Sequence, residues 1–551
     1  MFKKYLPLIL IILFAFVLRV VAIGRFPVGF SADEAVQGYT AYSILKTSHD
    51  EWGKLLPLNP RSFGDFKPPL YTYLTIPSLF LFDLNEFAVR LPSAFWGAWA
   101  ILAVFLLTQE LFGKRKMALL AALFLAVCPW HLVFSRAAIE ANLTAFFFPM
   151  GFYFFLKGLK NPRYFPWAVL FWGLNLYTYH SAKVLTVLFA IFILWWARKK
   201  IPWSSKKIKI SLILVIIFLS PIIFSLFKGG GGHRFLDVSL FNPTDKWEEV
   251  IKKQQEGWLK DLPLFNNKIL WVADKFTKNY LSYFSLNFLF TEGSPDDSYA
   301  NFPGRGLLHL WELPFLLAAV WFFYKRKEKM VLPLLVWLFL AALPAAVSKE
   351  PAHANRASTF LPLWSILSAY GGFYLWEFLN KKLSLKQRKI FLVLAWLIFI
   401  SSLLFFLEDY FTHAPKRLAK GLSYGYRQTI DYLKTVEGDY EKIVMTKRFS
   451  EPQVFVAFYQ KYNPYQYQKE AQDFLRYEKQ GFVFQDQLGV YRLGKFEFRD
   501  LNWNADKQLE KTLIVGGQQD FSLDLNLRPQ KVIYYPDGKE AFIIVDPKKT
   551  P

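Results

Sequence analysis

Long apolar runs separated by short polar segments fill most of the chain before residue 410. An α-helix needs about 20 apolar residues to cross the hydrocarbon core of a bilayer, and about eleven runs approach that length. They lie near residues 5–23, 87–108, 117–134, 139–157, 164–180, 183–197, 208–227, 306–324, 329–347, 357–379 and 388–407. The pattern predicts an α-helical polytopic membrane protein, in which the fifth and sixth runs are short for spans.

Basic residues gather in the short segments between these runs. With Lys3 and Lys4 in the cytoplasm, every second run ends on another basic segment on the same side. These segments are Lys114–Lys116, Lys157–Arg163, Arg198–Lys209, Lys325–Lys329 and Lys381–Lys389. An excess of Lys and Arg marks the cytoplasmic loops of membrane proteins. Two long segments, 24–86 and 228–305, therefore fall outside, and we expect the second to hold amphipathic helices on the bilayer surface.

The first apolar run resembles a signal peptide but lacks a clear cleavage site, so we expect an uncleaved span of a plasma-membrane protein. After about residue 408 the chain reads as a soluble domain. Strands are expected at Lys442–Thr446, Val490–Phe498, Thr512–Val515 and Lys531–Val545, and helices at Gln428–Thr435 and Gln453–Tyr462. We expect residues 1–410 to form the membrane domain and 411–551 an extracytoplasmic α/β domain.

Composition narrows the function. Aromatic residues make up 19% of the chain, more than one soluble core hides. The net charge of +23 could suit nucleic acid, but the basic loops account for much of it, so nucleic-acid binding is disfavoured. The single cysteine, Cys128, allows no intrachain disulfide. Gly229–Gly232 lacks the lysine and the preceding strand of a nucleotide-binding loop, which disfavours a nucleotide-sugar donor.

Two carboxylates follow the first span, in an aromatic setting. Asp33 and Glu34 lie near Phe30 and Tyr39. A solvated acidic pair is the plain alternative, but desolvation among rings makes a carboxylate a better proton acceptor. We therefore expect catalytic acids here.

A lysine stands before two prolines in the segment that begins at Phe63 and Gly64 and continues through Asp65 to Lys67. The prolines restrict the backbone of this segment. The lysine would serve as a point-charge partner for a phosphate, or it would simply reach the membrane interface as many lysines do. Both interpretations remain open from these residues alone.

Ionisable pairs recur at the outer ends of later spans. Arg136 and Glu140 are four residues apart, while His180 and Lys183, and His353 and Arg356, are each three apart. Arg136 and Glu140 would share one face of a helix, either as a simple ion pair or as part of the lining of a polar cavity. Ionisable residues near membrane depth are candidates for function. A rim of Lys67, Arg136, Lys183 and Arg356 would suit a phosphate or diphosphate.

These segments resemble the GT-C glycosyltransferases. Gly29–Lys46, with its Asp33-Glu34 pair, is similar to the first outer loop of dolichyl-phosphate-mannose protein mannosyltransferases and of their bacterial relatives, the lipid A aminoarabinose transferases. Phe66-Lys67-Pro68-Pro69, Ser135–Asn142 and His353–Arg356 with Leu361-Pro362 resemble later motifs of that family. The resemblance covers roughly residues 1–410.

The resemblance implies a sugar donor on a polyprenyl phosphate and an acceptor hydroxyl or amine on a glycan, lipid or protein. It makes Asp33 the general base or a carboxylate that orients the acceptor, and Lys67 and Arg136 the groups that hold the leaving phosphate during an inverting reaction. Asp65, Glu140, His180 and His353 would line the substrate cavity, although Glu140 stands where relatives often carry an aspartate. Some relatives bind a divalent metal, for which Asp33, Glu140 and His353 are the candidates, but no spacing here demands one.

Two other classes of function stay open. A transporter or flippase of a lipid-linked saccharide would use the same outer cavity, but it predicts ionisable residues deep in the spans. A membrane-anchored binding protein whose terminal domain does the work would leave the acids of the first loop unexplained.

Overall fold

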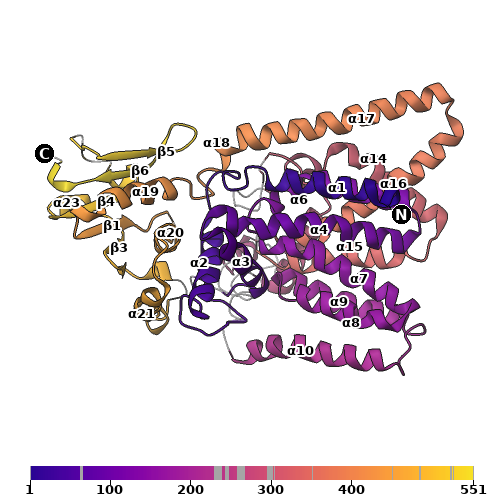
Figure 1. Ribbon diagram of the computed structural model, residues 1–551, viewed down its shortest axis with the longest axis horizontal. Helices are drawn as coiled ribbons and strands as arrows, with labels where there is room; N and C mark the ends of the chain where they lie inside the picture. Colours follow the sequence, from indigo (N-terminus) through magenta and orange to yellow (C-terminus); the bar gives the residue numbers. More distant parts are fainter. Residues whose placement is uncertain are drawn as a thin grey trace.

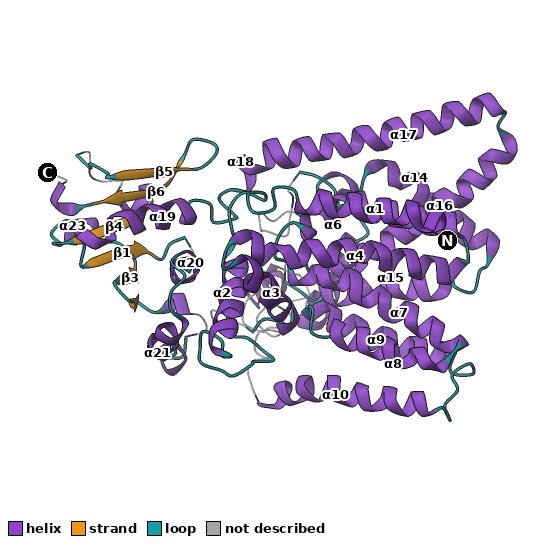
Figure 2. Cartoon of the chain, viewed as in Figure 1, coloured by secondary structure: helices purple, strands orange, loops and turns teal. Residues whose placement is uncertain are grey.

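The computed structural model shows a long helical bundle with a sheet-containing domain at one end (Figure 1). It describes residues 2–62, 66–228, 239–241, 247–256, 267–294, 302, 304–349, 352–449, 451–482, 485–521, 524 and 526–549. All strands of the described sheet belong to the C-terminal domain (Figure 2).

A helix occupies each apolar run of the sequence. The bundle comprises α1 (Phe2–Val20), α4 (Glu86–Phe112), α5 (Arg115–Val127), α6 (Pro129–Ser135), α7 (Thr144–Lys160), α8 (Phe165–Asn175), α9 (His180–Ala197), α10 (Lys206–Lys228), α14 (Leu313–Arg326), α15 (Val331–Ala346), α16 (Leu361–Lys382) and α17 (Leu385–Glu408). Among the described residues, four stretches are long and apolar enough on their own to cross a bilayer: Glu86–Phe112, His180–Ala197, Lys206–Ser225 and Leu385–Leu418. The helical membrane architecture is thus confirmed, while the number of spans stays a prediction.

The predicted span 117–134 is broken. α5 and α6 meet at a bend of 59° next to Pro129, which cannot donate a backbone hydrogen bond. The side chain of the buried Arg19 donates to the carbonyls of Leu125 and Ala126, which the break leaves without helical partners.

The first outer segment forms two helices between the bundle and the sheet domain. α2 (Ala32–Thr47) begins with a capping box, in which the Ser31 hydroxyl accepts from the Glu34 backbone and the Glu34 carboxylate accepts from the Ser31 backbone. α3 (Pro69–Phe82) begins at the second of the two prolines, where the missing N–H costs nothing. The prolines therefore stop the loop at Lys67 and start a helix directly after it.

The second outer segment contains α12 (Trp247–Glu256) and α13 (Lys268–Ser282), while the Gly229–Gly232 run lies outside the described residues. α13 exposes Ile269, Leu270 and Leu281. Apolar side chains exposed at a bundle end fit a helix lying on a bilayer surface, which stays a prediction.

The C-terminal domain contains a six-stranded mixed sheet in the order β2-β3-β1-β4-β6-β5. Its strands are β1 (Lys442–Thr446), β2 (Tyr491–Leu493), β3 (Phe496–Arg499), β4 (Thr512–Gly516), β5 (Lys531–Tyr534) and β6 (Glu540–Val545). β1 pairs in parallel with β3 and β4, and the other pairs are antiparallel. The segment Lys531–Val545, expected as strand, folds into the β5–β6 hairpin, which turns at Pro536-Asp537-Gly538 with Gly538 at φ 86°. The expected single strand over Val490–Phe498 is wrong, because Gly494 adopts a positive φ and turns the chain into a β2–β3 hairpin.

Helices cover this sheet and connect it to the bundle. They are α18 (Ala414–Leu418), α19 (Tyr426–Val436), α20 (Pro452–Tyr459), α21 (Pro464–Phe474), α22 (Arg476–Lys479), α23 (Trp503–Asp506) and α24 (Gln518–Phe521). α19 and α20 match the two predicted helices, while α21 was not predicted. α20 and α21 lie on the side of the domain that faces α2 (Figure 1).

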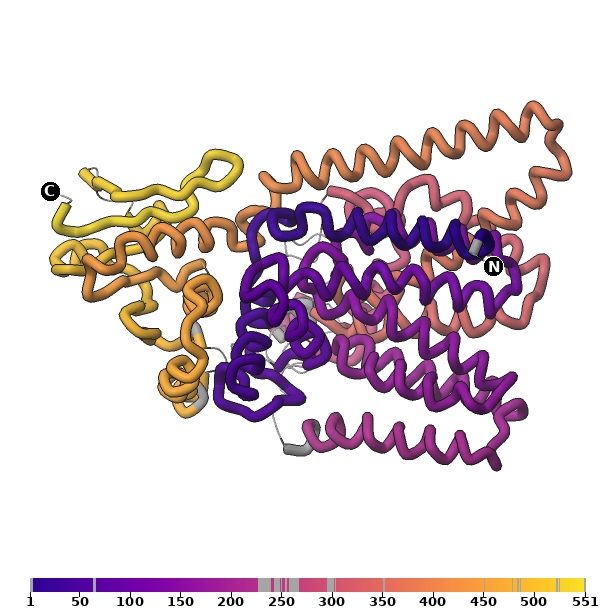
Figure 3. Tube along the Cα trace, in the orientation of Figure 1, coloured from indigo at the N-terminus to yellow at the C-terminus, as the bar shows by residue number. Residues whose placement is uncertain are grey.

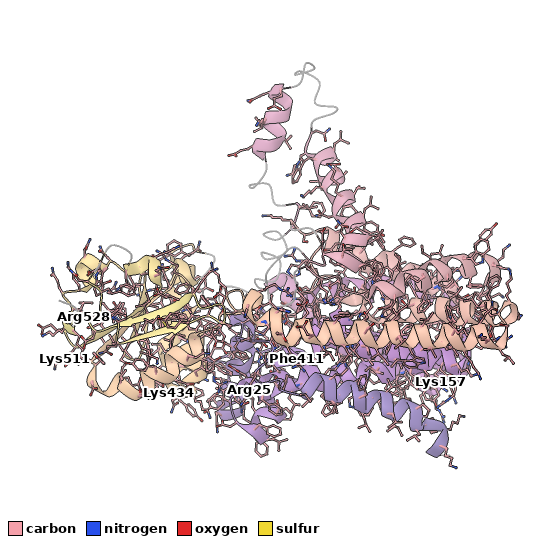
Figure 4. All side chains as sticks on the ribbon, turned by 90° about the horizontal axis from the view of Figure 1, so that it is seen from above. Arg25, Lys157, Phe411, Lys434, Lys511 and Arg528 are labelled. Carbon is pink, nitrogen blue, oxygen red and sulfur yellow. The ribbon has the colours of Figure 1, made fainter. Side chains whose placement is uncertain are left out.

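The two ends of the bundle differ in chemistry. Lys157, in the last turn of α7, lies at the end far from the sheet domain, whereas Arg25 and Phe411 lie near that domain (Figure 4). The chain terminus that carries Lys3 and Lys4 is also at the far end (Figure 1). The basic loops therefore share one end of the bundle, and the acids of α2 lie at the other.

Candidate active site

Asp33 and Lys67 form a close ion pair where α2 and α3 begin. The Lys67 Nζ lies 2.6 Å from Asp33 Oδ1, with side-chain exposures of 9% and 24%. The Lys67 backbone N–H donates to the carbonyl of Pro60, which fixes the lysine from the other side. Burial by itself disfavours the ammonium, but the carboxylates of Asp33 and Glu140 outweigh it and raise the pKa of Lys67. The lysine is therefore a permanent cation in a mostly dry setting.

Glu140 adds a second carboxylate from a different part of the chain. It begins the short 3-10 helix Glu140–Leu143 after α6 and is buried. Burial raises the pKa of Glu140, Lys67 opposes this effect, and the charge of Asp33 adds to it. Gln37 Nε2 donates to Glu140 Oε2 at 3.0 Å. Because Asp33 and Gln37 are four residues apart on α2, one face of this helix holds both Lys67 and Glu140.

Tyr179 lies near both this group and Arg356, which comes from a later outer segment. It precedes α9, and burial raises its pKa, as do the nearby charges of Glu140 and Asp33, whereas Arg356 and Lys67 lower it. Tyr179 therefore lies within electrostatic reach of cations from two distant segments.

The pair that follows Tyr179 lies at the start of α9. His180 lies within electrostatic reach of Lys67 and Lys183, and its ring meets the backbone of Phe66. Lys183 is half-buried one turn further along the helix. The structure thus brings Asp33, Lys67, Glu140, His180, Lys183 and Arg356 to one region, which includes three of the four cations of the expected rim.

Glu34, expected as a second catalytic acid, is buried in an ion pair with Arg90. Its carboxylate receives two hydrogen bonds from Arg90, Nε to Oε1 at 2.8 Å and Nη2 to Oε2 at 3.1 Å, and both side chains are fully buried. The backbone N–H of Ala138 also donates to Oε1. Both carboxylate oxygens are thus occupied inside the protein.

Arg90 completes this arrangement and was missed in the sequence. Its remaining N–H groups donate to the carbonyls of Ile23, Pro27 and Gly29. The sequence does contain an indication of this role, because Arg90 lies one turn inside an otherwise apolar helix, where an unpaired charge costs free energy.

Arg136 lies outside the expected phosphate rim. Its guanidinium donates to the carbonyls of Leu18 and Val21 at 2.6 and 2.9 Å and packs against the rings of Tyr410 and Phe411, 5.2 and 5.0 Å from their centroids. The side chain holds the end of α1 against the end of α17. The turn after α6 directs it there, while Glu140, four residues later, enters a separate 3-10 helix, so the two do not share a helical face.

Two remaining candidates are placed less directly. His353 lies in the segment between α15 and α16. Its ring Nδ1 accepts from the backbone N–H of Asn355, and its backbone N–H donates to the Tyr283 hydroxyl. Asp65 lies outside the described residues, so its role in the substrate cavity stays a prediction.

A divalent metal fits this arrangement poorly. Among the described residues, no group of three His, Cys, Asp or Glu side chains lies close enough to hold an ion. Asp33, the best placed candidate, already carries the Lys67 ammonium on one oxygen. Lys67 thus supplies positive charge where the metal would be expected.

Comparisons with known proteins bear on this geometry. Residues 66–224 match the model of a family described as dolichyl-phosphate-mannose-protein mannosyltransferase. The chain is similar to ArnT from Cupriavidus metallidurans in the apo state, with 12% identity and a TM-score of 0.55 over 98% of this chain and 97% of that one. The same ArnT bound to undecaprenyl phosphate gives 12% identity and a TM-score of 0.52 over the same shares. A comparison with curated proteins found no match.

A third solved structure is similar over part of its length. The archaeal oligosaccharyltransferase AglB from Archaeoglobus fulgidus, in complex with an inhibitory peptide and a dolichol-phosphate, matches at 16% identity and a TM-score of 0.49. The match covers 83% of this chain and 64% of AglB, so the chain spans less than two thirds of that protein. The match to ArnT confirms the GT-C fold with a C-terminal sheet domain, and the resemblance drawn from the motifs is confirmed.

Proposed function

We propose that this protein is a polyprenyl-phosphate-dependent glycosyltransferase that transfers a sugar to an acceptor hydroxyl or amine with inversion at the anomeric carbon. One observation carries the proposal. Asp33, Lys67 and Glu140 come from three separate segments and meet in a buried group at the end of the bundle away from the basic loops. Such convergence costs desolvation energy, and unlike the fully buried Glu34–Arg90 pair this group keeps part of Asp33 exposed, as a site that receives a substrate requires.

The residues divide the reaction between them. The acceptor oxygen or nitrogen attacks the anomeric carbon, the bond from that carbon to the phosphate oxygen breaks, and the polyprenyl phosphate leaves with the bonding electrons. Lys67 neutralises the charge that grows on the leaving phosphate, and in a mostly dry site this electrostatic effect is large. Asp33 takes the proton of the acceptor. Arg356 and Lys183 extend the positive charge toward the phosphate.

The ion pair suggests how binding prepares the base. While Lys67 Nζ rests on Asp33 Oδ1, the carboxylate is a weak proton acceptor. A donor phosphate competes for the same ammonium. When Lys67 turns to the phosphate, Asp33 loses part of its counter-charge and becomes more basic, so the base is activated only when a donor is present.

The comparisons support this kind of donor. The residues matched by the mannosyltransferase model include Lys67, Glu140, Tyr179 and Lys183. The structure of ArnT, which shares the fold over nearly the whole chain, was obtained with undecaprenyl phosphate. The similarity to ArnT at 12% identity supports the fold alone. The proposal of a phosphate-linked donor rests on the charged group around Lys67.

We further propose that the protein lies in the plasma membrane, with the active site and residues 411–551 on the extracytoplasmic side of a membrane domain formed by residues 1–410. The support is that the basic end of α7, marked by Lys157, lies at the end of the bundle opposite to α2, which carries the acids (Figures 1 and 4). Positive residues stay on the cytoplasmic side during insertion. A transporter receives less support, since the buried Arg19, His131, His309 and Glu312 lie in or beside the terminal turns of their helices rather than at mid-span.

The direct test uses purified protein, a polyprenyl-phosphate sugar and membrane extract as the source of acceptor. Asp33→Asn should lower kcat by about 10²- to 10⁴-fold, the usual contribution of a general base, while donor binding persists. Asp473→Asn, an exposed aspartate on α21, is the matched control and should behave as wild type. Transfer by Asp33→Asn at the wild-type rate would remove Asp33 from the mechanism.

Lys67→Ala tests the phosphate role separately. Removal of the cation should raise the Kd for an undecaprenyl-phosphate probe by about 10-fold or more, since each 1.4 kcal/mol is a factor of 10. Lys461→Ala, an exposed lysine paired with Asp83, is the control. An unchanged Kd would refute the role of Lys67.

A further inference from the structure

The C-terminal domain packs directly on the helix that carries Asp33. Figures 1 and 3 show α2 between the bundle and the sheet domain, next to α20. Two faces of α2 make different contacts. Asp33, Gln37 and Thr40, spaced by four and three residues, meet Lys67, Glu140 and Glu51. The positions between them, including Gly38 and Tyr39, meet the C-terminal domain.

Contacts with the domain run along the whole length of α2. Phe30, just before the helix, packs against Phe458 at 4.7 Å between ring centroids. In the middle, the Tyr39 hydroxyl donates to the carbonyl of Tyr462 at 3.0 Å. At the far end, Gln468 Nε2 lies within 3.2 Å of Ser43 Oγ, Thr47 Oγ1 and the carbonyl of Asp50.

Gly38 shows how closely α2 is held. A Cβ at this position would lie 2.6 Å from Val89 Cγ2 of α4 and 2.7 Å from Phe458 Cε2 of α20. Real Cβ atoms do not approach so closely, so α2 is pressed between a membrane helix and the C-terminal domain. Glycine is the one residue that fits between them without a shift.

The same domain is also tied to the membrane helix behind α2. The Tyr459 hydroxyl donates to Glu86 Oε1 at 2.6 Å, and Arg427 Nη1 lies 3.3 Å from Glu86 Oε2. Glu86 is the first residue of α4, the helix that carries Val89 and Arg90. The domain thus grips both α2 and the helix on which α2 rests.

We infer that the C-terminal domain is a positioning element of the catalytic site, in which α20 and α21 hold α2 so that Asp33 stays against Lys67 and in register with Glu140. Phe458, Tyr459 and Gln468 are its positioning residues. The inference rests on the proposed glycosyltransferase function for its catalytic consequence, but the placement of α2 can be measured without it. A shift of about 1 Å in a catalytic group costs up to about 100-fold in rate, so a loosened α2 should slow transfer strongly.

The first experiment uses the full-length protein with two variants, Gln468→Ala and Tyr459→Phe, alone and combined. The controls are Gln466→Ala, an exposed glutamine on the same helix, and Tyr534→Phe, an exposed tyrosine on β5. We expect the double variant to lower kcat by about 10-fold or more, with an unchanged Kd for an undecaprenyl-phosphate probe, because Lys67 belongs to a different segment. Equal loss of kcat in the double variant and in the double control would overturn the inference, as would wild-type kcat in the double variant.

A second measurement needs no enzyme activity. In a Cys128→Ala background, Asp33→Cys and Lys67→Cys place two thiols where the ion pair lies, and a short bis-methanethiosulfonate, which releases a sulfinate at each end as it forms two disulfides, joins them only while α2 keeps its place. Cross-linking should be several-fold slower with Gln468→Ala and Tyr459→Phe than with the two controls. Equal rates would overturn the inference even if the protein proves not to transfer sugar. Failure of the proposed function would instead appear as absent transfer by the wild type, with this difference in rates retained.

A rescue variant distinguishes placement from general damage. Gly38→Ala should slow cross-linking and transfer, because its new methyl group pushes α2 away from α4 or α20. Phe458→Leu opens space on the domain side, and the double variant should recover part of both rates. Additive losses would show that the contact with Phe458 does not set the position of α2.

Discussion

Two acid–base pairs stand side by side at the start of α2, and their surroundings differ. Asp33 holds one ammonium and keeps 24% of its side chain exposed. Glu34 holds the bidentate guanidinium of Arg90 with neither side chain exposed. Lysine is a single charge that can turn to a new partner, whereas a buried bidentate arginine is held by geometry. The two neighbouring carboxylates thus differ in how firmly they are held, which fits the proposed catalytic role of Asp33 and a structural role for Glu34.

Removal of one partner from the buried Glu34–Arg90 pair should have the largest effect on stability. Glu34→Ala leaves Arg90 charged and buried, which should lower the free energy of unfolding by about 3–5 kcal/mol. Thermal unfolding in detergent measures the loss. Asp33→Ala should cost less, about 1–3 kcal/mol, because Asp33 is partly exposed and the carboxylate of Glu140 remains near Lys67. Similar losses for both variants would erase the distinction between the pairs.

Replacement of Lys67 by arginine should have an intermediate effect, which appears in kcat. Lys67→Arg keeps the charge but places a planar fork where the structure has a point charge, so kcat should fall by about 10-fold. Lys67→Ala, which also removes the charge that stabilises the leaving phosphate, should lower kcat further. Transfer rates at saturating donor measure this. An arginine variant as slow as the alanine variant would indicate that the shape of lysine, rather than its charge, is required.

Arg136 tests whether a buried cation outside the pair acts on structure alone. Arg136→Lys loses several hydrogen bonds to the carbonyls of the 18–26 segment and should lower the free energy of unfolding by about 1–2 kcal/mol. The Kd for an undecaprenyl-phosphate probe should stay at its wild-type value. A clear rise in that Kd would return Arg136 to the phosphate site.

The smallest effect concerns pH and Glu140. Because burial raises the folded pKa of Glu140, the folded state binds more protons than the unfolded state between the two pKa values. Its contribution to stability is therefore present below the ordinary pKa near 4.5 and is lost as pH rises through the folded value. Unfolding of Glu140→Gln, compared with wild type from pH 4 to neutral, should show a smaller decline with rising pH. Parallel curves would contradict the raised pKa.

The motifs of the outer loops indicated much of the site in advance. Asp33, Lys67 and Glu140 stood out because carboxylates and cations beside apolar spans are expensive unless they are used, and the structure brings them together. Arg136 looked equally suitable. Its direction depends on the bend at Pro129 and on the end of α17, more than 270 residues later, which no local pattern records.

Local composition set the order and apolar length of the helices, most strands of the terminal domain and the separation of the basic loops from the acids of α2. Hydrophobic burial and the cost of moving charge across a bilayer act on each segment by itself. The pairing of Asp33 with Lys67, the closure of Glu34 by Arg90 and the packing of α20 against Gly38 were decided only by tertiary structure. Each of these contacts joins segments that are far apart in sequence. Packing of the helices therefore decides which cation each carboxylate meets and how much of it stays exposed.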